Sequence, residues 1–132
     1  MTSEFATTWT PSERTAVAPD GSDLRALLRL AGGSMALFEL GAGKTSRAVT
    51  HRTIEEIWYV LSGHGHLWRK QGEREETVAL EPGMCLTIPL ETHFQFRAST
   101  AGSISVLGVS LPPWPGEGEA VPVAGPWQPS AP

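Results

Sequence analysis

Residues 43–63 read GKTSRAVTHRTIEEIWYVLSG and combine strand-like alternation with polar side chains. Successive side chains of a strand point to opposite faces. Two sets of side chains therefore share a face, namely Arg47, Val49 and His51 in the first half, and Glu56, Trp58 and Val60 in the second. His51 and Glu56 have opposite parity, so the chain must bend within RTIE before both can point inward.

Short apolar runs separated by turn signals continue on both sides of this segment. They are MALFEL at 35–40, IEEIWYVL at 54–61, HLWRK at 66–70, TVALEPG at 77–83, MCLTIP at 84–89, HFQFRA at 93–98 and SISVLGVSL at 103–111. Strands at near-regular spacing, punctuated by Gly and Pro, predict an all-β sandwich or barrel. SDLRALLRL at 22–30 fits a helix or a strand. Its short length and its strand neighbours favour a strand.

Length and composition exclude several classes of protein. With 132 residues, 40% of them hydrophobic and 18% charged, the chain is expected to be one soluble domain. No apolar run is long enough to span a membrane, and the first residues do not resemble a secretory signal. The single cysteine, Cys85, excludes an internal disulfide and is expected to be a small buried side chain in a cytoplasmic protein. The net charge of −4, with scattered Lys and Arg, argues against a nucleic-acid partner.

Composition divides the chain into three parts. Residues 1–22 form a polar N-terminal arm with room for one short strand, and residues 23–111 form the predicted barrel. Residues 112–132 hold seven of the eleven prolines together with Trp114 and Trp127, which excludes a helix or a central strand. This tail either docks on the barrel through its tryptophans or is disordered.

The 43–63 segment resembles the first motif of the cupins, G-x5-H-x-H-x(3–4)-E-x6-G. Gly43, His51, Glu56 and Gly63 fall at the motif positions, and Val49 replaces the first histidine. The resemblance implies a small single-domain cupin, whose barrel is a double-stranded β-helix or jelly roll.

The second cupin motif, G-x5-P-x-G-x2-H-x3-N, is matched less well. Gly83 and Pro89 fit, and Glu91 replaces the glycine. His93 arrives one residue early, and Arg97 takes the place of the final Asn. The two motifs still occur in the expected order with a short segment between them.

In metal-binding cupins these motif positions hold a divalent ion. The resemblance therefore implies a site of His51, Glu56 and His93, a set of two His and one carboxylate that suits Fe(II) but also Mn, Ni, Co or Zn. The alternative is a cupin that has lost its metal, in which Glu56 and His93 are acid–base groups. His64 and His66, which follow the motif, are expected on an exposed turn.

Four further residues are candidates for binding a substrate. Trp58 is expected to form an aromatic wall beside Glu56, or simply to pack in the core. Arg47, Gln95 and Arg97 are candidates for holding an anionic group, although the arginines could instead reach solvent at strand ends.

These features favour a metal-dependent enzyme that acts on a small organic metabolite inside the barrel. The metabolite would be anionic or polyketide-like, and the reaction would be that of a dioxygenase, cyclase, isomerase or lyase. The alternative is a metal-free or non-catalytic cupin that binds a small ligand. A homodimer is also expected, because Phe94, Phe96, Ile57 and Tyr59 have the parity to point outward and would need covering.

Overall fold

The computed structural model describes residues 3–130, and every regular element among them is a strand. The outermost residues of the predicted arm and tail, 1–2 and 131–132, lie outside this part. The strands are β1 (Ala16–Val17), β2 (Asp23–Leu30), β3 (Gly33–Leu40), β4 (Val49–His51), β5 (Glu55–Ser62), β6 (Gly65–Gln71), β7 (Arg74–Leu80), β8 (Cys85–Ile88), β9 (His93–Ala98), β10 (Ile104–Leu111) and β11 (Ala120–Pro122). Within 3–130, no helix is long and apolar enough to cross a membrane.

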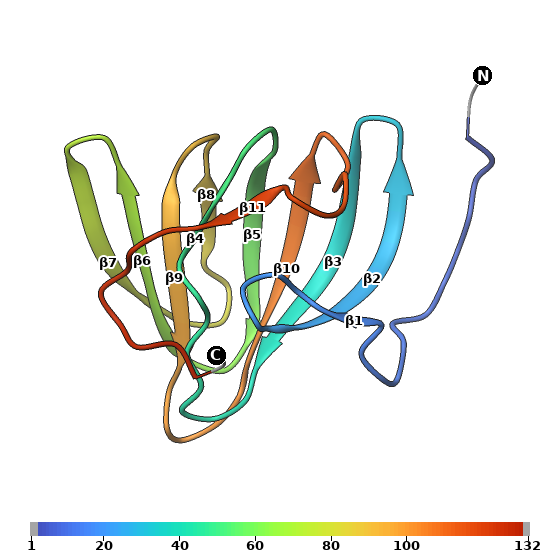
Figure 1. Cartoon of the computed structure of the whole chain (residues 1–132). Helices are drawn as coiled ribbons and strands as arrows, with labels where there is room; N and C mark the ends of the chain where they lie inside the picture. The colour runs from blue at the N-terminus through green and yellow to red at the C-terminus, as the bar shows by residue number, and fades with distance from the viewer. Residues whose placement is uncertain (1–2, 131–132) are drawn as a thin grey trace.

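The strands form two antiparallel sheets that face each other (Figure 1). One sheet has the order β1-β2-β3-β10-β5-β8 and the other β11-β4-β9-β6-β7. Strand β10 pairs with β3 on one side and β5 on the other, so strands distant in sequence lie side by side. This is the jelly-roll arrangement. The all-β jelly-roll prediction is confirmed, and the segment that fitted both helix and strand forms β2.

Aromatic side chains from both sheets meet in the core. The Trp58 ring of β5 lies 5.8 Å from the Phe94 ring and 5.1 Å from the Phe96 ring, both in β9 of the opposite sheet. All three side chains are buried. Edge-to-face contacts of this kind add to the large apolar area that aromatic side chains bury. They hold the two sheets together directly beside Glu56.

Two predictions about which side chains face the core are wrong. Phe94 and Phe96 point into the core, because the inward face of β9 is the one that meets Trp58. Cys85 is exposed, because it precedes Leu86, whose side chain takes the inward face of β8. Ile57 and Tyr59 do lie on the outer side, where they are exposed. The homodimer therefore stays a prediction that no longer includes the two phenylalanines.

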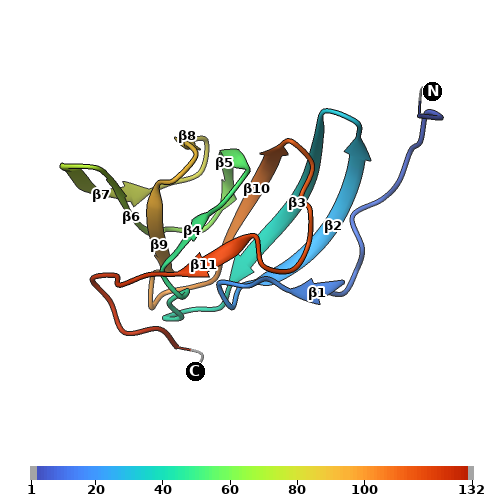
Figure 2. The ribbon, with the colours of Figure 1, turned by 45° about the horizontal axis from the view of Figure 1, so that its top comes forward.

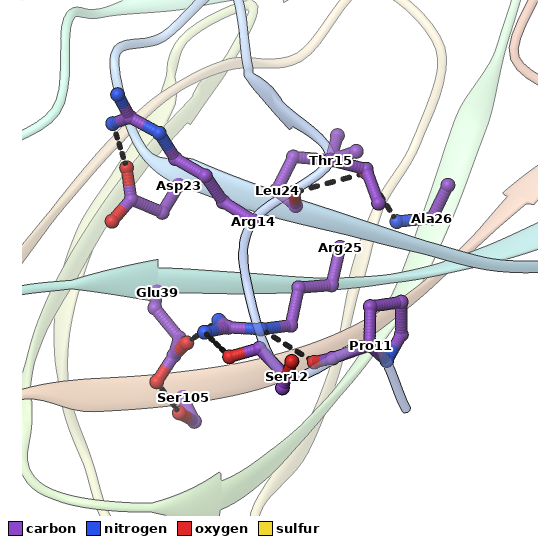
Figure 3. A network of polar contacts seen from close by, with 10 residues as sticks. All are labelled: Pro11, Ser12, Arg14, Thr15, Asp23, Leu24, Arg25, Ala26, Glu39 and Ser105. Atoms are coloured by element: carbon purple, nitrogen blue, oxygen red, sulfur yellow. Dashed lines mark hydrogen bonds and ion pairs between the residues drawn. The ribbon is translucent and has the colours of Figure 1, made fainter. Parts of the chain in front are cut away.

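The N-terminal arm is fixed to the barrel from residue 11 onward (Figure 3). Thr15 Oγ1 accepts a hydrogen bond from the Ala26 backbone N–H (2.9 Å). Arg25 Nε donates to the Pro11 carbonyl (3.0 Å), and the Arg25 guanidinium is also paired with the carboxylate of Glu39. Residues 3–10 extend away from the sheets (Figures 1 and 2).

The C-terminal tail docks on the barrel, which settles the two alternatives left by its composition. Its strand β11 pairs with β4, so the tail crosses the front of the barrel (Figures 1 and 2). Farther along, Trp127 N–H donates to Gln95 Oε1 (3.2 Å), and the Arg97 guanidinium lies 4.1 Å from the centroid of the Trp127 ring. A cation over an indole face is attractive. The outer face of β9 is therefore covered by the tail.

Candidate functional site

A cavity of about 270 Å³ is lined by side chains of both sheets and of the segment after β10. Most of its lining is apolar and includes the rings of Phe38, Trp58, Phe94 and Trp114. Its polar lining includes Asp20, His51, Glu56 and Ser110. The volume lies near the lower end of typical ligand pockets, roughly 300–1,000 Å³. The cavity therefore suits a small, mostly apolar molecule that presents a few polar atoms.

Glu56 is held at the cavity wall by two hydrogen bonds. Trp58, two residues along β5 on the same face, donates its indole N–H to Glu56 Oε1 (3.3 Å). Ser110, which lies opposite Glu56 in the β5–β10 pairing, donates its hydroxyl to Oε2 (3.2 Å). Glu56 as a whole is 4% exposed. Its orientation is therefore set by the register of two neighbouring strands.

His51 ends β4 and faces Glu56. Its Nδ1 lies 3.9 Å from Glu56 Oε1, and this buried nitrogen has no hydrogen-bond partner among the described residues. The imidazole ring makes edge contacts with Phe94 (5.2 Å between centroids) and Trp114 (5.4 Å). A buried polar atom without a partner is rare and calls for an explanation. His51 lines the cavity, and its buried Nδ1 faces the carboxyl group of Glu56.

Burial shifts the pKa of both groups toward their neutral forms. Loss of solvation raises the pKa of Glu56 to about 7, against the opposing effect of the bonds from Trp58 and Ser110. Loss of solvation lowers the pKa of His51 to about 4. At neutral pH His51 is uncharged and Glu56 is present in both protonation states. The contact between them is therefore not an ion pair.

Asp20 is a second buried carboxyl group that lines the cavity. Its Oδ1 accepts bonds from the Ser22 hydroxyl (2.7 Å) and the Ser22 backbone N–H (2.9 Å). Burial nevertheless raises the pKa of Asp20. Its charge also favours the protonated form of Glu56. The cavity thus places two acidic groups in an environment that disfavours negative charge.

The structure brings together only some of the side chains that the motifs single out. His51, Glu56 and Trp58 meet in the cavity, and Val49 also lines it. Arg47 lies beside the loop before β2, where its guanidinium donates to the Pro19 carbonyl (3.0 Å).

His93 does not meet the other two candidate metal ligands, so this prediction is wrong. It alternates with Phe94, which takes the inward face of β9 and lines the cavity. The motif spacing places the family histidine at position 94, and the one-residue offset turns His93 to the outer face. Gln95 and Arg97 share that outer face and contact the tail, so the prediction that they bind substrate in the cavity is also wrong.

The residues present do not fit the divalent-ion site that the resemblance implies. Val49 supplies no donor atom, and His93 lies on the opposite face from His51 and Glu56. Across residues 3–130, no three His, Cys, Asp or Glu side chains form a group that could hold an ion. His64 and His66 are exposed at the β5–β6 turn and at the start of β6. No catalytic step is therefore assigned to an ion.

The motif comparison missed four residues at or beside the site: Asp20, Ser110, Trp114 and Glu119. Ser110 was detectable, because it shares the inward alternation of Ile104 and Val106. The other three come from loops and the tail, where no periodicity marks which side chains return to the barrel.

Solved structures similar to the whole barrel share little sequence with it. KdgF from Halomonas sp. has 16% identity and a TM-score of 0.66, covering 80% of this chain and 94% of KdgF. A Streptomyces PAC13 variant with uridine has 16% identity and a TM-score of 0.70, covering 91% and 92% of the two chains. A Klebsiella pneumoniae protein with a double-stranded β-helix domain has 13% identity and a TM-score of 0.66, covering 82% and 89%. At these identities the likeness concerns the fold.

Among curated proteins, none matches the chain in sequence. The family model for the cupin domain does match it, over residues 36–110, which is more than half of the chain. These residues run from β3 into β10 and include both motif regions. The chain belongs to the cupin family.

Proposed function

We propose that this cupin is an enzyme that moves a proton on a small, uncharged and largely apolar organic molecule bound in the cavity. The observation that carries the proposal is the buried pair of Glu56 and His51, with the unpartnered Nδ1 of His51 in an apolar pocket. A carboxyl group that can both take and return a proton near neutral pH is suited to general acid–base catalysis.

In the proposed reaction, ionised Glu56 removes a proton from a carbon next to a carbonyl group. The electron pair of the broken C–H bond forms the enolate, and the neutral imidazole of His51 donates a hydrogen bond from its N–H group to the enolate oxygen. Glu56, now protonated, returns the proton to another carbon of the conjugated system. The sequence is an isomerisation in which no atom is gained or lost and nothing is oxidised.

The character of the lining supports an uncharged substrate. Glu56 and Asp20 are buried in the cavity wall, whereas Arg29, which also lines the cavity, is exposed and donates to the Trp114 carbonyl (3.1 Å). An anionic group beside Glu56 and Asp20 would therefore meet two acidic side chains. Gln95 and Arg97, which were expected to hold such a group, lie on the covered outer face. The aromatic rings favour a flat molecule, in keeping with the polyketide-like alternative. Uridine, which is bound in the PAC13 structure, serves as a second probe.

The proposal assigns no role to a divalent ion, since the donor atoms do not converge. A metal-dependent enzyme in this cavity would need a third donor besides His51 and Glu56. The rate of deuterium exchange into a bound ketone is therefore expected to be the same in the chelator-treated protein and after addition of Zn²⁺ or Mn²⁺.

Deuterium exchange tests the proposal. The protein is incubated in D₂O with a panel of small aryl ketones, and exchange at the carbon next to the carbonyl is followed by NMR. The wild type is expected to accelerate exchange, and Glu56→Gln is expected to lose about 10²-fold or more of that acceleration. Glu55→Gln, the exposed neighbour on β5, is the matched control.

Two outcomes would contradict the proposal. One is equal exchange by the wild type and by Glu56→Gln. The other is tight binding of aryl ketones or uridine, measured by calorimetry, with no exchange above the solvent rate. This second result would favour a non-catalytic ligand-binding cupin.

A further inference from the structure

We infer that Glu119, in the segment after the barrel, is the positioning residue for the His51–Glu56 pair. The inference rests on the proposed function only in taking this pair as the chemical centre. The C-terminal segment would then determine the geometry of the site in addition to covering it.

Glu119 binds every residue of the turn that joins β4 to β5. Its Oε2 accepts hydrogen bonds from the backbone N–H groups of Thr53 (2.7 Å) and Ile54 (3.2 Å), and its Oε1 accepts one from the Thr53 hydroxyl. The Glu119 carbonyl accepts a further bond from Arg52 N–H (3.0 Å). Glu119 is 4% exposed, so these bonds are shielded from water.

This turn is what allows His51 and Glu56 to face each other. The two residues have opposite parity, so a regular strand through both would send one side chain outward. Residues 52–54 break the alternation, and the buried Ile54 anchors the break in the core. Glu119 gives the turn amides the acceptors that a partner strand would otherwise provide. A slip of one residue here would turn Glu56 to the outer side.

The bonds of Glu119 also mark it as a support rather than a second proton carrier. Burial alone would raise its pKa, but the bonds from Thr53, Ile54 and Arg52 outweigh burial and lower the pKa. Both carboxylate oxygens are already engaged by the turn. Its charge is fixed by the same bonds that hold the turn.

Neighbours of Glu119 hold His51 from the same segment. Ala120, the next residue, is the pairing partner of His51 in the β11–β4 ladder and also lines the cavity. Trp114 contacts the His51 ring, and its backbone is tied to β3 through Ser34 Oγ (3.0 Å) and to β2 through Arg29 (3.1 Å). One short stretch therefore controls both the backbone and the ring of His51.

The test uses the indole N–H resonance of Trp58, which reports on its bond to Glu56 Oε1, together with amide hydrogen exchange of the turn. Glu119→Ala is expected to move the indole resonance and to speed exchange at Thr53 and Ile54 on the order of tenfold or more. Glu119→Gln keeps an acceptor for the turn amides and is expected to restore both signals. Glu117→Ala, an exposed carboxylate two residues earlier, is the matched control.

Thr53→Val keeps the test decisive if Glu119→Ala does not fold. It removes only the hydroxyl bond and is expected to move the same resonance by a smaller amount. An indole resonance and turn amides that match Glu117→Ala in the folded Glu119 variant, or that are unchanged in Thr53→Val, would overturn the inference. No substrate is involved, so loss of the exchange activity proposed above and failure of this test are separate results.

Discussion

His51 Nδ1 and Glu56 Oε1 lie 3.9 Å apart on two strands that a three-residue turn connects. Burial favours the neutral form of each group, raising one pKa and lowering the other. Each group therefore lowers stability in its charged form, Glu56 at high pH and His51 at low pH. Between about pH 4.5 and 6.5, rising pH lowers the free energy of unfolding through Glu56 and raises it through His51. The two effects oppose each other, because the folded and unfolded states then bind similar numbers of protons in total.

Replacing Glu56 with Gln removes the contribution of Glu56 to the pH dependence of stability. The pKa of Glu56 is about 7 when folded and 4.5 in its unperturbed state, so its contribution to stability is present below pH 4.5 and is lost as the pH rises toward 7. At pH 8 the free energy of unfolding of Glu56→Gln is therefore expected to exceed that of the wild type by on the order of 3 kcal/mol. This gain is expected to disappear below pH 4.5. Urea unfolding at a series of pH values measures it.

The exposed Glu55→Gln variant provides the baseline for this series. It makes the same change of side chain at the neighbouring residue, and the stability difference of Glu56→Gln is compared with it at each pH. A Glu56→Gln variant with a constant stability difference from pH 4 to 8 would show that Glu56 ionises in the folded protein as it does in a peptide.

Ser110 adjusts the protonation of Glu56. Its hydroxyl bond to Oε2 favours the carboxylate and lowers the pKa of Glu56, in opposition to burial. Ser110→Ala is therefore expected to move the titration of Glu56 to a pH above that of the wild type. Carbon-13 NMR of labelled glutamate side chains measures the midpoint. Ser105→Ala, on the opposite face of β10, should leave it unchanged, and a downward shift in Ser110→Ala would contradict the assignment.

Local alternation was sufficient to predict the first half of the site. The pattern of residues 43–63 placed His51, Glu56 and Trp58 on inward faces once a bend was allowed, and the structure has that bend at 52–54. The alternation could not reveal what holds the bend. Glu119 is more than sixty residues away in sequence, and only tertiary packing brings its carboxylate to the turn.

The prediction from the second motif was wrong, because the inward-facing residue of β9 lies one position after His93. Glu91, which stands in place of the motif glycine, has a positive φ of 67°, so the turn keeps the left-handed backbone that glycine usually provides. The strand that follows then carries Phe94 inward at the histidine position, and His93 outward. In a strand such an offset exchanges the two faces. A spacing match without the strand register therefore assigned the wrong side chain.

This offset predicts different outcomes for the two histidines. His93→Ala is expected to leave stability within about 0.5 kcal/mol and the proposed deuterium exchange within twofold, because its side chain lies outside the cavity. His51→Ala removes the only imidazole that lines the cavity among the described residues and should slow exchange at least tenfold. Thermal unfolding with and without Zn²⁺ should not distinguish His93→Ala from the wild type. If Zn²⁺ stabilised the wild type but not His93→Ala, the result would support the metal site of His51, Glu56 and His93.

Gly63, the last residue of the first motif, has both a positive φ and no room for a side chain. Comparison with a glycine that has only the positive φ separates these two effects. The φ of Gly63 is +81°, and an added Cβ would lie 2.0 Å from the Ser103 carbonyl oxygen. Gly72 also has a positive φ, +58°, but a Cβ there would meet nothing within 4 Å. Gly72→Ala should therefore cost only the backbone term, about 1 kcal/mol. Gly63→Ala should cost at least about 3 kcal/mol, because the β5–β6 turn must also move away from β10. Urea midpoints of the two variants test this, and equal losses would mean that backbone conformation alone explains the motif glycine.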